Sequence, residues 1–348
     1  MADLPPLFAR VLRGDFVESG HRGDAAVVDE GGRLLAAGGE PGRPIFPRSA
    51  AKPFQALPLI ASGGAERFRL GAAEIALMCA SHGGEPRHVR VAARLLSHGG
   101  FSARDLVCGP QEPMDPTSAR LLARRQEKPT KLHNNCSGKH AGLLLACRSL
   151  GLPPKGYWKV GHPLQVEIRQ RIARLGSVPE ERMEVAVDGC GLPVLSMPLS
   201  ALALAYARLV SDSVSGETPA EREGRRSICA AMWERPEMVA GRERFTTDFL
   251  SAERDRSIGK EGAEAVYAIG IRAPRNEPSI GIAFKIEDGG TRARDAVALS
   301  LLERLGLLSS RARRGLARYA APAIVNAAGD AVGSIRAEVP IIRRDAPD

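Results

Sequence analysis

Aromatic residues are scarce in this chain of 348 residues, at 4% of the sequence, and none of its six cysteines forms a C-x-x-C pair. No apolar run reaches the length that crosses a membrane, and the N-terminal residues lack the apolar core of a secretion signal. The chain is also too long to need a disulfide framework. These absences predict a reduced, cytoplasmic protein with no membrane partner.

Charge of one sign is not concentrated in any long segment. The formal net charge is +9, which by itself would suit nucleic acid. The arginines are mixed with acidic residues, however, and the short basic run Arg311–Arg318 has no zinc-finger spacing, basic zipper or aromatic–basic motif. We therefore expect a mildly basic solvated surface and no nucleic-acid partner.

Strand patterns gather at both ends of the chain, and helical patterns fill the middle. The Gly-Gly turn between Asp24–Asp29 and Arg33–Ala37 indicates a hairpin, and apolar runs at Ala263–Ile271 and Ile280–Ile286 indicate further strands. A final hairpin is expected after residue 322. Among the helices, the one that starts near Ser49 is expected to kink or end at Pro58.

This distribution predicts an α+β fold, α/β-type and three-layered, in a single domain of residues 1–348. One antiparallel sheet would be built from N- and C-terminal strands, about residues 16–48 and 257–340. A helical region of about residues 49–256 would fold over it. With 44% hydrophobic residues the chain can bury a large core.

The segment Phe46–Phe54 carries the pattern with the clearest chemistry. Ser49 and Lys52 stand three residues apart at a predicted helix start, so the hydroxyl and the amine can lie on one face. A serine needs a nearby base to act as a nucleophile, and a lysine can be that base when burial or a neighbouring cation lowers its pKa. Chance occurrence, or a serine that only caps the helix, is the alternative.

Other polar segments compete as site material. They are Ser81–Pro86, His133–His140, Asp188–Pro193 and the stretch around Lys260. Lys260 stands between glycines ahead of a predicted strand, and the alternative for it is an exposed lysine in a turn.

These segments together resemble the type-3, Rhizobium-etli-type L-asparaginases, the thermolabile asparaginase II family. His133–His140 reads His-Asn-Asn-Cys-Ser-Gly-Lys-His, a long and specific motif. Gly83 stands where the family usually has serine, and Glu261 stands where glycine is common. The matching segments run in order and are His21–Gly23, Phe46–Lys52, Cys79–His82 with Gly84–Pro86, His133–Gly142, Asp188–Pro193, and Lys260 with Gly262–Glu264.

The resemblance implies a fold related to serine β-lactamases and glutaminases, a homodimer, and hydrolysis of L-asparagine to L-aspartate and ammonia. Carried over by motif, it implies two catalytic Ser–Lys pairs: Ser49 with Lys52, and Ser81 with Lys260. Ser49 would attack and Lys52 would take its proton, while the second pair relays protons. Our candidates for holding the zwitterionic end of the substrate are Arg48, His82, Asp188 and Gly189.

The resemblance also implies metal ligands at Cys136, Lys139 and Cys190. Two thiolates suit zinc, and Cys136 and Lys139 lie three apart at a helix start. Lysine is an unusual ligand because its amine must first lose a proton. Two reduced buried thiols, or a disulfide formed on oxidation, are the alternatives. We expect zinc to orient substrate and not to be required for the Ser–Lys chemistry, with His140 either supporting the ligands or only packing.

Two other functions fit parts of the pattern. One is a glutaminase or another Ser–Lys amidohydrolase, such as a penicillin-recognising enzyme. The other is a non-catalytic protein that binds amino acids.

Overall fold

The computed structural model describes residues 4–274 and 277–343 and divides into two compact units. The first unit contains the chain up to Ala50, the segment Met197–Ser211 and the chain from Arg256 onward. The second contains Ala51–Ser196 and Asp212–Asp255. Among the described residues, no helix is both long enough and apolar enough to span a membrane.

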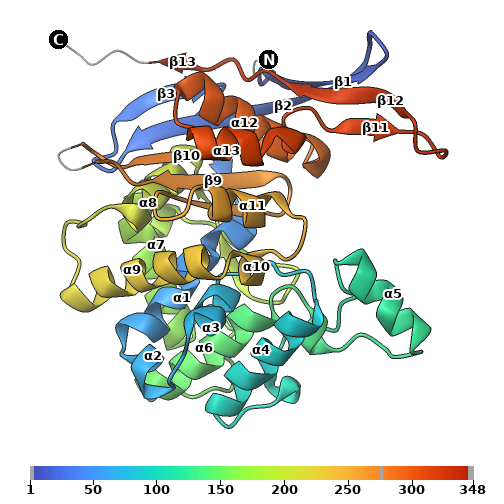
Figure 1. Cartoon of the computed structure of the whole chain (residues 1–348). Helices are drawn as coiled ribbons and strands as arrows, with labels where there is room; N and C mark the ends of the chain where they lie inside the picture. The colour runs from blue at the N-terminus through green and yellow to red at the C-terminus, as the bar shows by residue number, and fades with distance from the viewer. Residues whose placement is uncertain (1–3, 275–276, 344–348) are drawn as a thin grey trace. The chain divides into compact units, whose positions relative to one another are not determined.

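The first unit is organised by an antiparallel sheet in the order β11-β12-β1-β2-β10-β9-β8, with β3 beside β2 and β13 beside β3 (Figure 1). Within the described residues it has nine strands, from both ends of the chain: β1 (Leu7–Arg13), β2 (Phe16–Asp29), β3 (Leu34–Gly38), β8 (Ser257–Gly262), β9 (Val266–Ile271), β10 (Ile280–Ile286), β11 (Ala323–Val325), β12 (Ala331–Ala337) and β13 (Ile342–Arg343). The predicted α+β class and antiparallel sheet are confirmed.

Helices cover both faces of this sheet, which makes the unit three-layered. Side chains along a strand alternate between faces, so Tyr267 and Gly270 of β9 face opposite ways. The guanidinium of Arg294, at the start of α12 (Arg294–Leu305), lies 5.9 Å from the centre of the Tyr267 ring. Gly270 instead approaches Tyr206 of α8 (Leu199–Val210). The unit also contains α13 (Ser310–Gly315) and the short pair β4 (Pro44–Ile45) and β7 (Met197–Pro198).

The second unit is mainly helical, and α6 (Ser137–Leu150) is buried along its length from Ser137 to Cys147. Gly138 lets α6 approach α3 (Ala72–Met78), because an added Cβ would lie 2.3 Å from the carbonyl oxygen of Leu77. The other elements are α1 (Lys52–Ala61), α2 (Gly64–Arg67), α4 (Pro86–His98), α5 (Pro116–Arg124), α7 (Pro163–Gly176), α9 (Pro219–Glu234), α10 (Pro236–Val239), α11 (Phe245–Ala252) and the hairpin of β5 (Val185–Val187) and β6 (Pro193–Leu195).

The structure refines two local predictions and adds one strand that was not predicted. The predicted strand Ala263–Ile271 is the end of a hairpin, in which β8 and β9 are joined by a tight turn where Glu264 and Ala265 have positive φ. Pro58 does not end its helix, since α1 continues to Ala61. The strand β1 has only seven residues and was not predicted, because the adjacent Phe8 and Ala9 are both buried and so break the inside–outside alternation.

A close contact between α8 and the sheet provides a test of this packing. A Cβ added at Gly281 of β10 would lie 1.8 Å from the carbonyl oxygen of Ala203, so Gly281→Ala must displace the helix backbone. We expect a loss of about 1–3 kcal/mol or more in the free energy of unfolding, measured by denaturant titration. Gly161→Ala is the control, because its new Cβ would meet no atom within 4 Å. Equal stability of both variants would contradict the packing.

Candidate active site

Ser49 lies in η1 (Arg48–Ala51), a 3-10 turn that leads directly into α1 at Lys52. The N-cap of α1 is Ala51, and no side chain caps the helix, so Ser49 is not a capping serine. Arg48 has a φ of 52°, a left-handed conformation that is unfavourable for a non-glycine residue. Backbone strain of this kind is concentrated at functional sites.

The Lys52 side chain is almost completely buried, at 1% exposure, and is held by three groups of the helical unit. Its Nζ donates to Ser81 Oγ at 3.2 Å, to the carbonyl oxygen of Asn135 at 3.4 Å and to the carbonyl oxygen of Ala80. The amine is therefore fixed beside a serine hydroxyl. The motif had paired Lys52 with Ser49 and Ser81 with Lys260, so this contact adds a link between the two expected pairs.

Ser81 begins the coil segment that joins α3 to α4. Its N–H donates to the carbonyl oxygen of Val239 at 2.9 Å, which ties the segment to the end of α10. Gly84 has a φ of +74°, and a Cβ there would lie 3.0 Å from the carbonyl oxygen of His133 and from the Cα of Pro113. Only glycine fits this backbone without strain, so the close packing fixes the position of Ser81.

His82 uses both ring nitrogens inside the protein. Its Nδ1 accepts the N–H of Gly84 at 3.1 Å, so the proton of the neutral ring is on Nε2, which donates to Ser137 Oγ at 2.9 Å. The Ser137 hydroxyl in turn donates to the carbonyl oxygen of Leu132 at 3.0 Å. The ring thus links the Ser81 segment to the start of α6.

Lys260 lies inside β8 with its side chain fully buried, and is not an exposed lysine in a turn. Its Nζ lies 3.2 Å from Glu261 Oε1 and donates to the Glu261 carbonyl oxygen at 3.0 Å. Glu261, at the position where glycine is common in the family, therefore places a buried carboxylate beside Lys260. At the other departure, a Cβ on Gly83 would lie 3.3 Å from Asp115 Cβ, so a serine there would need a small shift of that neighbour.

The three predicted metal ligands come together in the helical unit. Lys139 Nζ lies 3.0 Å from Cys190 Sγ, and the Cys190 thiol is hydrogen-bonded to Cys136. All three residues are buried. Cys190 is held in the hairpin turn between β5 and β6, where the positive φ of Gly191 closes the loop.

The charges of this group are coupled. The hydrogen bond from Cys190, together with the ammonium groups of Lys139 and Lys52, holds the pKa of Cys136 well below its usual range although burial opposes this. Burial alone would lower the pKa of Lys139, but the charges of Cys136 and Cys190 outweigh burial and raise it. Both shifts act in the direction of a Cys136 thiolate beside a Lys139 ammonium.

Thiolates are ligands that zinc favours, and here two thiols and an amine are linked by hydrogen bonds. Zinc would replace the proton of the lysine and of the second thiol. Within residues 4–274 and 277–343, no group of three or more His, Cys, Asp or Glu side chains could hold a metal.

His140 follows the lysine and is also completely buried. The Tyr157 hydroxyl oxygen accepts the N–H of Val107 at 3.0 Å and is hydrogen-bonded to His140 Nδ1 at 2.8 Å. His140 Nε2 is buried and has no hydrogen-bond partner within the described chain. A buried ring nitrogen without a partner is unusual in a folded protein.

Asp188 and Gly189 occupy the same hairpin turn as Cys190. The Asp188 carboxylate accepts the Gly189 N–H at 2.6 Å and contributes to the field that raises the pKa of Lys139. Gly189 is exposed, and nothing lies within 4 Å of an added Cβ. Both residues therefore lie at the surface, in the turn that carries the buried Cys190.

Three residues that hold this site were not predicted. Asn135 supplies a carbonyl to Lys52, and Ser137 binds His82; both lie inside the motif His133–Gly142, which marked the region but not these roles. Tyr157 lies in a loop without any pattern, so the sequence contained no signal for its contact with His140.

The model of the family L-asparaginase II matches residues 9–337. The chain therefore belongs to the L-asparaginase II family. Membership supports an asparaginase-type amidohydrolase and fits a small-molecule substrate. A comparison with curated proteins finds no significant match.

Among solved structures, the chain is similar to two of Mglu and to one of a Bacillus glutaminase. For Mglu the identity is 16%, the TM-score 0.46, and the match covers 82% of this chain and 67% of Mglu. For Mglu in its glutamate form the identity is 14%, the TM-score 0.46, and coverage is 82% of this chain and 61% of Mglu. For the Bacillus glutaminase, solved in 4.3 M NaCl, the identity is 11% and the TM-score 0.40, and the match covers 82% of this chain and 91% of the glutaminase.

The buried state of His82 predicts how stability changes with pH. Burial, and then the charges of His88, Lys52, His133 and Arg244, hold the pKa of His82 well below its usual range. As pH falls through about 6.5, the unfolded histidine takes up a proton that the folded one refuses, so the folded state loses stability. We expect the unfolding free energy to fall by up to about 1.4 kcal/mol per pH unit for this group.

Denaturant titrations between pH 7.5 and 5.5 measure this slope. His82→Asn lowers stability at every pH because it breaks the link to Ser137, but it should flatten the slope. His98→Asn, on the exposed side of α4, is the control and should keep the wild-type slope. An unchanged slope in His82→Asn would contradict the buried neutral ring.

Proposed function

We propose that the protein hydrolyses L-asparagine to L-aspartate and ammonia through an ester on a serine. The observation that carries this proposal is the buried amine of Lys52, which is hydrogen-bonded to Ser81 and follows Ser49 by one helical turn. An amine that is buried beside a serine hydroxyl suits a general base, not a surface cation. Family membership supports the same class of reaction.

In the proposed reaction, Lys52 first releases to solvent one of the three protons of its resting hydrogen bonds, and Ser49 Oγ then attacks the side-chain amide carbon of asparagine while the neutral Lys52 amine accepts the hydroxyl proton. The C–N bond then breaks, and the proton returns from Lys52 to the leaving ammonia. Water attacks the resulting ester, loses a proton to Lys52 and releases aspartate, and Lys52 returns this proton to Ser49. We assign the proton relay to Ser81, and its Oγ at 3.2 Å from Lys52 Nζ supports this role.

Lys260 is the second lysine of the proposed set by its motif, and we assign it a proton-relay role with Ser81. Its buried partner Glu261 would keep it positively charged. Stabilising charge that develops in the transition state is usually a large part of catalysis, so a fixed cation is useful in such a site.

We assign the two charged ends of asparagine to residues of opposite sign. Arg48 is proposed for the substrate carboxylate, and its strained backbone before Ser49 fits a positioning role. Asp188 is proposed for the ammonium, with Gly189 beside it in the same turn. His82 has no ring nitrogen left for a substrate, so we propose that it positions Ser81 and does not bind asparagine.

Zinc, when bound by Cys136, Lys139 and Cys190, would supply a positive centre that orients the substrate. The serine and lysine side chains perform the proton transfers without it. By the family resemblance we further propose a homodimer in the cytoplasm, which light scattering of the purified chain would test for its oligomeric state.

Substitution of the proposed nucleophile and base tests the reaction. Ser49→Ala and Lys52→Met should each lower kcat for ammonia release by about 10³-fold or more, and the double variant should be little worse because the two groups act as one unit. Ser62→Ala changes an exposed serine at the far end of α1 and should keep the wild-type rate. Multiplicative losses, or a fast Ser49→Ala enzyme, would count against the assignment.

The same assay decides between substrates. L-asparagine should be hydrolysed faster than L-glutamine, and a chromogenic β-lactam should not be turned over. A higher kcat/KM for glutamine would assign the chain as a glutaminase. Asparagine binding without ammonia release from the wild type would instead indicate a non-catalytic binder.

Metal analysis tests the proposed zinc site. Protein purified without chelator should contain close to one zinc per chain, because two thiols and an amine converge there. Cys136→Ala with Cys190→Ala should remove it, whereas Cys147→Ala, on the same helix α6, should not. Stoichiometric zinc in the first double variant would overturn the ligand set. A metal-free wild type that still releases ammonia would contradict the predicted occupancy but not the Ser–Lys chemistry.

A further inference from the structure

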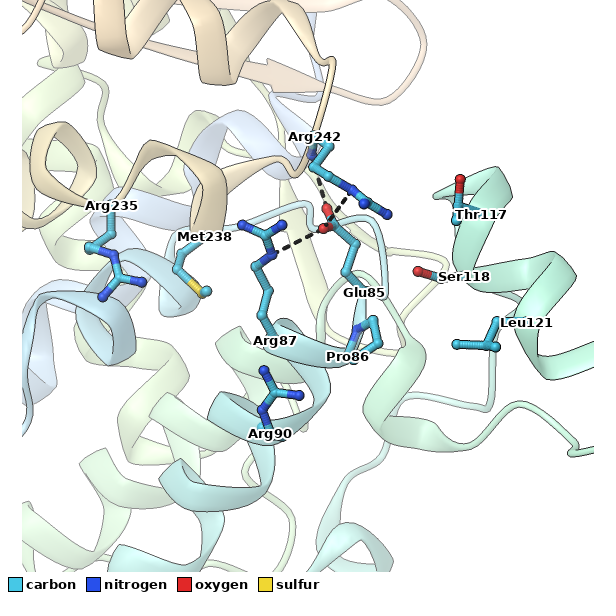
Figure 2. A pocket seen from close by; sticks show the side chains of 10 residues that line it. All are labelled: Glu85, Pro86, Arg87, Arg90, Thr117, Ser118, Leu121, Arg235, Met238 and Arg242. Atoms are coloured by element: carbon cyan, nitrogen blue, oxygen red, sulfur yellow. Dashed lines mark hydrogen bonds and ion pairs between the residues drawn. The ribbon is translucent and has the colours of Figure 1, made fainter. Parts of the chain in front are cut away.

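A cavity of about 560 Å³ lies within the helical unit, between the starts of α4 and α5 and the segment around α10. Figure 2 shows four arginines on its walls: Arg87 and Arg90 from α4, and Arg235 and Arg242 from the two sides of α10. None of the residues assigned above to catalysis, to the ends of the substrate or to zinc lines it.

Three of these arginines are oriented by ion pairs, Arg87 and Arg235 through Nε, and Arg242 through Nε and one terminal nitrogen. Arg87 and Arg242 both bind Glu85 Oε2, at 3.1 and 3.2 Å, and Arg235 binds Glu237 at 2.8 Å. A guanidinium has five N–H donors in a rigid fork, so a contact through one nitrogen orients the group without exhausting it. Glu85 is buried, at 1% exposure, and works as a fixed anchor for two of the arginines.

Arg90 is different because it is exposed and has no ion-pair partner among the residues that the structure describes. Arg242 also contacts Asp115 at 3.1 Å. Four guanidinium groups therefore face three carboxylates, those of Glu85, Asp115 and Glu237. One positive charge therefore remains uncompensated. A ligand could bind this charge and the N–H groups of the other guanidiniums that their carboxylates do not use.

We propose that this cavity binds a small molecule through a phosphate group. The oxygens of a phosphate match several guanidinium forks at once, and charge-assisted bonds of this kind are the strong ones. The cavity is larger than a phosphate needs, and Leu121 and Met238 line it as well. A phosphate ester with a small apolar group therefore fits better than the free ion.

The cavity is lined by the same chain segments that hold Ser81 of the proposed active site. Glu85 is four residues after Ser81, and the segment that carries Arg235 and Arg242 also supplies the Val239 carbonyl that binds the Ser81 N–H. A ligand held by these arginines would rest on the segment that positions Ser81. The proposal of binding does not depend on the proposed reaction.

Calorimetric titration of the full chain at constant ionic strength tests the site, with phenyl phosphate, inorganic phosphate and malonate as probes. Phenyl phosphate should bind the wild type saturably and at least tenfold more tightly than malonate, with inorganic phosphate between them. Arg90→Gln should weaken phenyl phosphate at least tenfold. Arg87→Gln should do the same, while Arg120→Gln, an exposed arginine of α5 outside the cavity, should leave the affinity unchanged.

Thermal melts of all variants check that they fold, and Arg90 is exposed, so its loss should not unfold the chain. Three results would overturn the proposal: no saturable binding of phenyl phosphate by the wild type, wild-type affinity in folded Arg90→Gln, or malonate binding as tightly as phenyl phosphate. The readout is binding alone, so it stays valid if the chain does not hydrolyse asparagine.

Discussion

The helical unit depends on one costly feature, a lysine amine buried at the start of α1. Removal of such a group from water costs several kcal/mol unless its hydrogen-bonding capacity is satisfied. The Lys52 amine meets the end of α3 through Ala80 and Ser81, and the start of α6 through Asn135. These bonds compensate the burial of the amine only when α1, α3 and α6 are packed together. The packing of these helices therefore also sets the geometry of the site.

The neighbouring polar groups follow the same rule. His82 joins the Ser81 segment to Ser137 at the first residue of α6, and the next turn of that helix carries Lys139 against two thiols. α6 thus begins with buried polar contacts and continues as an almost wholly apolar helix. This division places the buried polar groups at the start of α6 and aliphatic packing along the rest of the helix.

Much of the fold was predictable from local patterns, and the rest depended on contacts distant in sequence. Strong turns marked the hairpin of β2 and β3, and Pro86 and Pro116 marked the starts of α4 and α5. Periodicity showed that α8 is an apolar helix but not that it lies on the sheet, since this follows from Gly270 and Gly281. In the site, the motifs marked the segments that carry the proposed site residues. They did not show that Lys52 binds Ser81, that Glu261 pairs with Lys260, or that Tyr157 meets His140.

The central claim is that Ser49, activated by Lys52, forms the ester with the substrate. The most direct test is to quench the enzyme with acid during turnover of L-asparagine and to map the added mass by peptide mass spectrometry. The account predicts an aspartyl group on the peptide that contains Ser49, and its absence in Ser49→Ala. An aspartyl group on the peptide that contains Ser81 would contradict it and would make Ser81, the residue that Lys52 contacts directly, the nucleophile.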